Sequence, residues 1–443
     1  MVEPNWVWGV IEMTLLCALA MTGMHIFIVL GAIGVSFAIL YYGDIRAIKF
    51  IGGSAFTRTA EYAMSMVPLF LLMGAWVEKA GLGRDAYDSC MKWLARVKGS
   101  LADVAIVAQA IFGTVTGSAL ASAATIGGIS LPEMKRYGYS AALRTGSIAS
   151  GAMLSNLIPP STIAIYYALL TDESVGKLFI AGVIPGIILT LLFMLVVYVW
   201  VTLRPADAPM LPPDVHFTFK EKIKSSATLI PIAIIFLVLI GGIYLGWFGP
   251  TEAAGIGAFT VMIVCLAYRR LTWVTFNDAL LSTVRTSGMV LMLLVGAFIF
   301  SHTLALTEIS KAIGGLIAHA NLGYIPLMYI IVLVLVIVGI PLDGFVFLIF
   351  TVPVLYSVVT TSPGAPPMAS VWFGTLLVLL VMFAQVTPPM ANLLYLAQMI
   401  DGCPTRDVII GALPFYTSTA VLIVLMIHFP WLVTWLPSKM LGG

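Results

Sequence analysis

The sequence predicts an all-α polytopic membrane protein built from two inverted repeats, and three observations predict it. Hydrophobic residues make up 60% of the chain and charged residues only 9%, whereas a soluble domain carries roughly 25% charged residues. Apolar stretches near the ~20 residues that a membrane helix needs recur from Trp6 to Trp435. A proline pair at 159–160 returns at 388–389 in a similar context. Most of the chain must therefore lie in a lipid bilayer, in two related halves.

The composition also excludes several classes of protein. We count about ten to thirteen apolar stretches, which leave no room for a soluble domain. The net charge of +2 comes from basic residues scattered over short loops, so no nucleic-acid partner is expected. No GxxxxGK[ST] run is present, so an ATPase motif does not supply energy.

The internal repeat is found by laying SNLIPPS (155–161) over AQVTPPM (384–390), at an offset of 229 residues. Five further pairs match at that offset: Tyr166 with Tyr395, Asp172 with Asp401, Lys177 with Arg406, Gly182 with Gly411, and Pro185 with Pro414. A proline pair inside an apolar run interrupts a helix. Matching interruptions in two halves are typical of transporters with inverted repeats. We therefore predict broken helices at 145–170 and 368–400.

The placement of Lys and Arg predicts how the chain is oriented, because basic residues accumulate in short cytoplasmic loops. Four basic stretches are placed inside: 79–98, 135–144, 204–224 and 269–285. Segment 101–131 then enters and leaves from the cytoplasm as a re-entrant helical hairpin. Its repeat partner 330–360 follows the outside loop 307–323 and enters from the opposite face, so the repeats are inverted. One loop opposes this orientation, because it places Arg46, Lys49 and Arg58 outside.

The domain organisation follows from the repeat. Residues 1–203 form the first inverted repeat and residues 227–443 the second. The segment 204–226 between them holds four prolines followed by KEKIKSS. It is predicted to be a cytoplasmic linker that ends in a short interfacial helix.

Each break frees main-chain carbonyls, which are tolerated in a membrane only where they face protein, water or an ion. Polar side chains surround the first break and the turn of the first hairpin: Thr116, Ser118, Ser155, Asn156, Ser161 and Thr162. The second break offers Gln385, Thr387 and Asn392. Neutral oxygens at unwound helices suit Na⁺, and half-helix N-termini attract an anionic group. A site for Na⁺ and an anionic solute is therefore expected there.

Asp343 is the clearest carboxylate deep in an apolar run, in the sequence VGIPLDGFVF. Acidic residues inside a membrane are costly and usually functional. Asp343 either binds Na⁺ or a proton, or caps the N-terminus of a hairpin helix. The sequence leaves both interpretations open.

Nine short stretches carry a family resemblance along the whole chain: VPLFLLMG (67–74), FGTVTGSALASAATIGG (112–128), LPEMKRYGY (131–139), LIPPS (157–161), LFIAGVIPG (178–186), GPTEAAGIGA (249–258), PLDG (341–344), TPPM (387–390) and GALPF (411–415). In this order they resemble the large, DctM-type membrane subunit of tripartite ATP-independent periplasmic (TRAP) transporters. The resemblance implies a multi-pass protein of the bacterial inner membrane with an elevator-type fold and coupling to Na⁺. It also implies a small four-helix membrane subunit as partner, and a periplasmic binding protein that delivers a carboxylate-bearing solute.

The resemblance also implies ligands. A first Na⁺ site would use the turn at Ser118 and the carbonyls of Ser155, Ile158 and Pro160. A second would use Ala384, Thr387 and Pro389, with the second hairpin and its Asp343 supplying the rest. The residues expected to bind the solute are Thr116, Asn156, Ser161, Gln385 and Asn392. Where family members tend to have Gly, this chain has Ser155 and Ala384, whose side chains would narrow the room for the solute.

The alternative function is a self-sufficient, ion-coupled carboxylate permease of similar architecture that needs no binding protein. Only the DctM-like stretches argue against it. An intramembrane aspartyl protease needs two embedded acids, and Asp343 stands alone in its run. No enzyme activity is therefore expected. A pure scaffold subunit is equally disfavoured, because it has no use for paired polar helix breaks.

Overall fold

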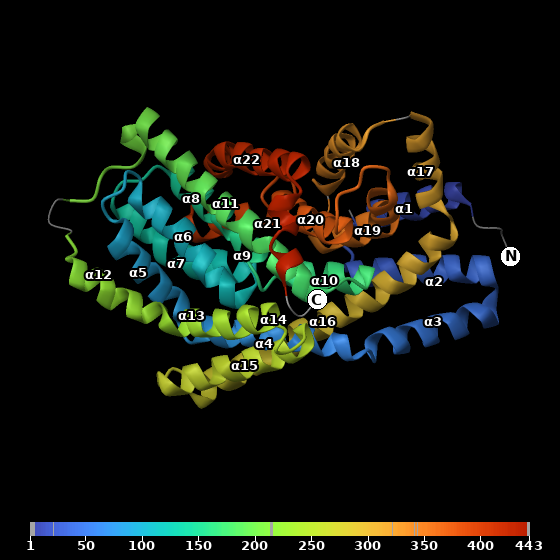
Figure 1. Cartoon of the computed structure of the whole chain (residues 1–443), viewed down its shortest axis with the longest axis horizontal. Coiled ribbons are helices and arrows are strands. Elements are labelled where there is room, and N and C mark those ends of the chain that lie inside the picture. The colour runs from blue at the N-terminus through green and yellow to red at the C-terminus, as the bar shows by residue number, and fades with distance from the viewer. Residues whose placement is uncertain are drawn as a thin grey trace.

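The computed structural model describes residues 5–20, 22–212, 216–320, 322–340, 342 and 344–440. Within these ranges all regular structure is helical, which confirms the predicted all-α class (Figure 1). Six of the described helices are long and apolar enough to cross a bilayer, or up to eight if each of two bent pairs counts as one span. Five shorter apolar helices accompany them. Long, bent and shorter apolar helices together account for the ten to thirteen apolar stretches of the sequence.

The α-helices, in chain order, are α1 (Trp6–Ala20), α2 (Ile26–Tyr42), α3 (Asp44–Thr59), α4 (Met66–Lys79), α5 (Leu82–Leu94), α6 (Ser100–Thr116), α7 (Ala119–Arg136), α8 (Ala141–Ala152), α9 (Leu154–Leu157), α10 (Thr162–Thr171), α11 (Val175–Leu203), α12 (Phe219–Ser226), α13 (Ile230–Phe236), α14 (Gly242–Tyr244), α15 (Pro250–Ala267), α16 (Trp273–Leu306), α17 (Ile309–Ala320), α18 (Tyr324–Gly339), α19 (Gly344–Thr361), α20 (Ala369–Gln385), α21 (Asn392–Asp401), α22 (Thr405–His428) and α23 (Trp431–Thr434). A 3₁₀ turn, η3 (Ala227–Leu229), and a π-helical turn, η4 (Leu237–Gly241), join α12, α13 and α14 into one bent rod.

The helices pack in two groups. One group contains α2, α3, α4, α15 and α16, which lie along the lower part of Figure 1. The other contains α6 to α11 and α20 to α22, with α19 packed on α10 and α20. We call the first group the frame and the second the core body.

The loop that opposed the predicted orientation is a helix. Residues 44–59 form α3, which packs on α2 and α16. Ala47 is buried, whereas Arg46 and Lys49 are exposed. Basic side chains on the exposed side of a helix at the membrane interface stay in water. Arg46 and Lys49 therefore need not belong to a loop between two spanning helices, as the charge pattern had implied.

The predicted linker also differs in its last part. Its helix α12 starts with a capping box between Thr218 and Glu221 and then continues into α13, so that residues 219–244 are continuous enough to span a membrane. The interfacial helix is thus the first part of a long spanning element rather than a separate one. It rests on α5, where the Trp93 indole N–H donates to the Ser226 hydroxyl at 2.9 Å. The division into repeats at 203 and 227 stays a prediction.

Two packed helix pairs and two broken helices position the candidate site. Helices α6 and α7 pack against each other and are joined by Gly117 and Ser118. Helices α18 and α19 form the second pair. The broken helix α8–α9/α10 bends by 43° at residues 158–161. The break between α20 and α21 holds a cis Pro388–Pro389 bond, and the first break holds a cis Pro159–Pro160 bond.

Candidate functional site

The turn of the first hairpin touches the first broken helix. Gly117 adopts a left-handed conformation with φ of 61°. Its carbonyl accepts hydrogen bonds from the Thr162 N–H at 3.4 Å and the Thr162 hydroxyl at 3.1 Å. A Cβ atom at Gly117 would lie 2.8 Å from the Pro160 carbonyl oxygen, too close for a side chain. Glycine is therefore required here both by the turn and by the approach of the break.

Four helix ends meet at this contact. Ser118 caps α7 by accepting from the Ala121 N–H at 3.3 Å, and Ser161 caps α10 by accepting from the Ala164 N–H at 3.2 Å. Helix α6 ends at Thr116, just before this turn, and α9 ends at Leu157, just before this break. Helix N-termini carry partial positive charge and C-termini partial negative charge. The arrangement can attract an anion at one side and a cation at the other.

Asn156 connects the two halves of the chain. Its side-chain N–H donates to the Met382 sulfur on α20 at 3.3 Å, and its amide oxygen accepts from the Thr162 hydroxyl at 3.3 Å. The first break is thereby held between the hairpin turn and the second broken helix. Ile158, at the break itself, packs against α11, because a Cβ at Gly186 would meet its side chain at 2.4 Å.

The Ser155 side chain has a structural contact, and its predicted carbonyl role in Na⁺ binding stays a prediction. Its side chain is fully buried and its hydroxyl donates to the Gln109 carbonyl of α6 at 3.0 Å. The same residue packs against Gly113, where a Cβ would lie 2.5 Å from the Ser155 Cα. The Ser155 hydroxyl therefore ties α9 to the hairpin. It lines neither of the two cavities described below, so it does not narrow the room for a solute there.

The second break is organised by its own main chain. The Thr387 hydroxyl donates to the Phe383 carbonyl at 2.7 Å, and the Thr387 N–H donates to the Ala384 carbonyl at 3.1 Å. Gln385 points at the start of α19, since a Cβ at Gly344 would lie 2.6 Å from its amide nitrogen. Within the described part of the chain, the Gln385 amide oxygen is buried without a hydrogen-bond partner. It is therefore one of the candidate acceptors for a ligand in this half.

The remaining predicted residues are placed as follows. Ala384 is buried, with its Cβ 3.5 Å from a Cβ built on Gly339. Pro389 and Asn392 are exposed. Asp343 lies outside the described residues, so both interpretations of it stay predictions.

A cavity of about 160 Å³ lies beside the hairpin turn. Thr116, Ser118 and Ala121 line it from the hairpin, and the frame supplies the rest: Leu71, Gly74, Ala75 and Glu78 from α4, and Ser282, Thr283 and Thr286 from α16. The predicted solute residues Asn156 and Ser161 line a separate cavity of about 10 Å³, at the limit for a single water molecule. The structure thus does not bring the predicted solute residues into one cavity. Sequence reasoning did not assign the α4 and α16 residues to the site. Leu71 and Gly74 belong to the VPLFLLMG stretch, but the others lie in apolar helices with no local signal.

Comparison with known proteins gives consistent results. The family model described as tripartite ATP-independent periplasmic transporter, DctM component, matches residues 13–432. The chain is 28% identical over 412 residues to the C4-dicarboxylate TRAP transporter large permease protein DctM of Pseudomonas aeruginosa, covering 92% of this chain and 93% of that protein. It is 26% identical over 415 residues to the sialic acid TRAP transporter large permease protein SiaM of Vibrio cholerae, covering 92% and 94%.

Among solved structures, the chain is similar to the Alcanivorax borkumensis YdaH transporter, whose crystal structure is described as having an unusual topology. The TM-score is 0.59 at 13% identity, over 97% of this chain and 99% of that one. At this identity the likeness concerns the fold alone.

Proposed function

Because the chain belongs to the DctM component family of tripartite ATP-independent periplasmic transporters, we propose that it is the large membrane subunit of a Na⁺-coupled importer for a small carboxylate solute. It is a multi-pass protein of the bacterial inner membrane and a secondary-transport permease. The relatives are named for C4-dicarboxylates and for sialic acid, both of which carry carboxylates. A small membrane subunit and a periplasmic binding protein are the proposed partners.

The contact between the hairpin turn and the first break carries this proposal. Neutral oxygens of Ser118, Pro160 and Asn156 lie on helix ends that converge there. Na⁺ is suited to carbonyl, hydroxyl and amide oxygens at unwound helices. The Gln385 amide oxygen offers a comparable acceptor at the second break.

The cavity beside Ser118 is the proposed solute site. At about 160 Å³ it lies below the ~300 Å³ lower end typical of drug-sized ligand pockets, which favours a small solute. Glu78 at the frame side would repel a carboxylate. The solute carboxylate is therefore expected at the Ser118 side, where the N-terminus of α7 favours an anion.

An elevator-type movement of the core body against the frame is part of the proposal. Helix α4 belongs to the frame, whereas α5 packs on α6 of the core body. The chain bends by 60° between α4 and α5, at Ala80 and Gly81. Arg270, between α15 and α16, donates to the Ala80 carbonyl at 3.4 Å and forms an ion pair with Asp85 of α5. A hinge with one cross-link from the frame is a natural place for such a movement.

Cross-linking tests this movement. In a variant without the four native cysteines, Ala121→Cys and Ser282→Cys place thiols on the hairpin and frame sides of the same cavity. A short thiol-reactive cross-linker is expected to abolish uptake in the double variant, whereas a reagent attached to one cysteine in either single variant fills part of the cavity and should lower uptake only in part. Full uptake by the cross-linked double variant would contradict movement at this boundary.

The partners are tested by uptake into proteoliposomes. The chain is reconstituted with its small membrane subunit, purified binding protein is added outside, and radiolabelled carboxylates are supplied under an inward Na⁺ gradient. Uptake is expected only with the binding protein present. Equal uptake without it would favour the self-sufficient permease and refute the tripartite assignment.

A further inference from the structure

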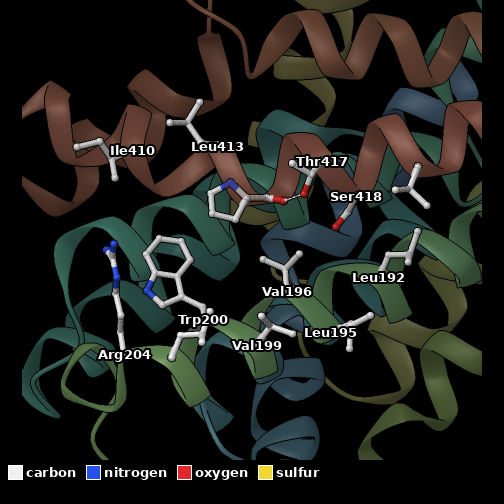
Figure 2. Close-up of a pocket in the computed structure, with 13 residues that line it drawn as sticks. Leu192, Leu195, Val196, Val199, Trp200, Arg204, Ile410, Leu413, Thr417 and Ser418 are labelled. Atoms are coloured by element: carbon white, nitrogen blue, oxygen red, sulfur yellow. Dashed lines mark hydrogen bonds between the residues drawn. The ribbon is translucent and has the colours of Figure 1, made fainter.

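An apolar groove of about 550 Å³ runs between α11 and α22. Figure 2 shows Val196, Val199 and Trp200 of α11 facing Leu413 and Thr417 of α22 across it. Its volume falls within the roughly 300–1,000 Å³ of small-molecule sites. The groove is therefore large enough for an elongated apolar ligand.

The groove opens on the outside of the protein. Leu195 is 55% exposed and Leu413 is 51% exposed, although both line it. Both helices are among those long and apolar enough to cross a membrane. The Thr417 hydroxyl is already used, since it donates to the Pro414 carbonyl at 2.6 Å. The middle of the groove thus offers apolar surface to the hydrocarbon of the bilayer.

One end of the groove is charged. Arg204 stands there opposite Ile410 (Figure 2), and it is the one charged side chain in the lining. Arg204 is exposed and has no ion pair within the residues the structure describes. The nearby Asp207 carboxylate is occupied, because it accepts from the Trp200 indole N–H at 2.8 Å. The groove therefore ends in an exposed cation beside an aromatic ring, as at a membrane interface.

The charge pattern predicts that this end faces the cytoplasm, where the basic stretch 204–224 is placed. The cytoplasmic leaflet carries anionic lipids, and basic groups between helices on that side bind their headgroups. We propose that the groove between α11 and α22 binds an acyl chain of an anionic phospholipid, whose phosphate pairs with Arg204. This site lies away from the hairpin turn and does not depend on the proposed coupling ion.

The test is lipid binding by the purified chain in nanodiscs that contain equal amounts of phosphatidylglycerol and phosphatidylcholine, measured by native mass spectrometry. The wild-type chain is expected to retain phosphatidylglycerol preferentially. Arg204→Gln should reduce that preference about fivefold, which corresponds to the loss of about 1 kcal/mol from the pairing of the lipid phosphate with Arg204. Lys220→Gln, a change of the same charge on α12 outside the groove, should leave the preference unchanged.

A second variant tests the groove itself. Leu413→Trp fills it and is expected to abolish the preferential retention of phosphatidylglycerol. Leu191→Trp is the control, because Leu191 is 60% exposed on α11 but does not line the groove. Gel filtration of each variant shows whether it is folded.

The proposal is overturned if Arg204→Gln and the wild-type chain prefer phosphatidylglycerol equally. It is also overturned if a folded Leu413→Trp variant still retains phosphatidylglycerol preferentially, or if the small membrane subunit displaces the lipid. Adding palmitate without phospholipid distinguishes an anionic phospholipid from a free fatty acid as the ligand of the groove. Binding of palmitate with no retained phospholipid would assign the groove to free fatty acids instead.

Discussion

Replacing Asp401 by Asn is expected to lower the free energy of unfolding by about 3–5 kcal/mol, because it leaves a buried guanidinium without its counter-ion. Arg144 of α8 holds both carboxylate oxygens of Asp401 on α21, with N–O distances of 2.6 and 2.9 Å. The two side chains are only 11% and 1% exposed. Arg144 also donates to the Tyr139 carbonyl at 2.7 Å. The ion pair joins the two halves of the core body.

The measurement is thermal unfolding of the detergent-purified chain. Asp88→Asn serves as the control, because Asp88 forms a solvent-exposed pair with Arg84 at 4.0 Å, and such pairs contribute about 0–1 kcal/mol. The double variant Arg144→Met/Asp401→Leu should recover most of the loss, since apolar residues can replace a buried pair. A loss no larger for Asp401→Asn than for Asp88→Asn would contradict the assignment.

Replacing Thr162 by Val is expected to raise the Na⁺ concentration for half-maximal uptake about fivefold to tenfold. The Thr162 hydroxyl lies 3.1 Å from the Gly117 carbonyl oxygen and 3.3 Å from the Asn156 amide oxygen, so it holds the hairpin turn and the proposed ligand Asn156 in place. Removing one hydrogen bond of this kind costs about 1 kcal/mol, and about 1.4 kcal/mol is a tenfold change in affinity. The measurement is the initial rate of uptake against Na⁺ concentration.

Thr171→Val is the matched control on the same helix. The Thr171 hydroxyl donates to the Tyr167 carbonyl within α10 at 2.9 Å and touches no part of the break. The control should retain the Na⁺ dependence of the wild-type chain. If both valine variants shift alike, the Thr162 contact has no special part in Na⁺ binding.

Local backbone chemistry made the hairpin turn and both breaks predictable. Gly117 next to Ser118 stops one helix and caps the next, and paired prolines cannot continue a helix. The match of Gly182 with Gly411 also has one physical cause, because each receives a main-chain carbonyl. A Cβ would lie 2.2 Å from the Leu157 oxygen at the first and 2.0 Å from the Ala142 oxygen at the second.

Contacts between distant segments could not be predicted in this way. Asp172 and Asp401 match in the repeat, yet Asp172 ends α10 in a left-handed conformation with φ of 55°, whereas Asp401 pairs with Arg144. The frame side of the cavity comes from α4 and α16, where Glu78 and Thr283 carry no recognisable motif. The helix α3 was missed because its charges were interpreted as a loop.

The most direct test of Na⁺-coupled transport is uptake by the complete reconstituted system, with binding protein outside, under three separately imposed gradients: Na⁺, K⁺ and protons. Solute accumulation is expected to require the Na⁺ gradient and to saturate with external Na⁺. Accumulation driven equally well by a proton gradient in the absence of Na⁺ would contradict it.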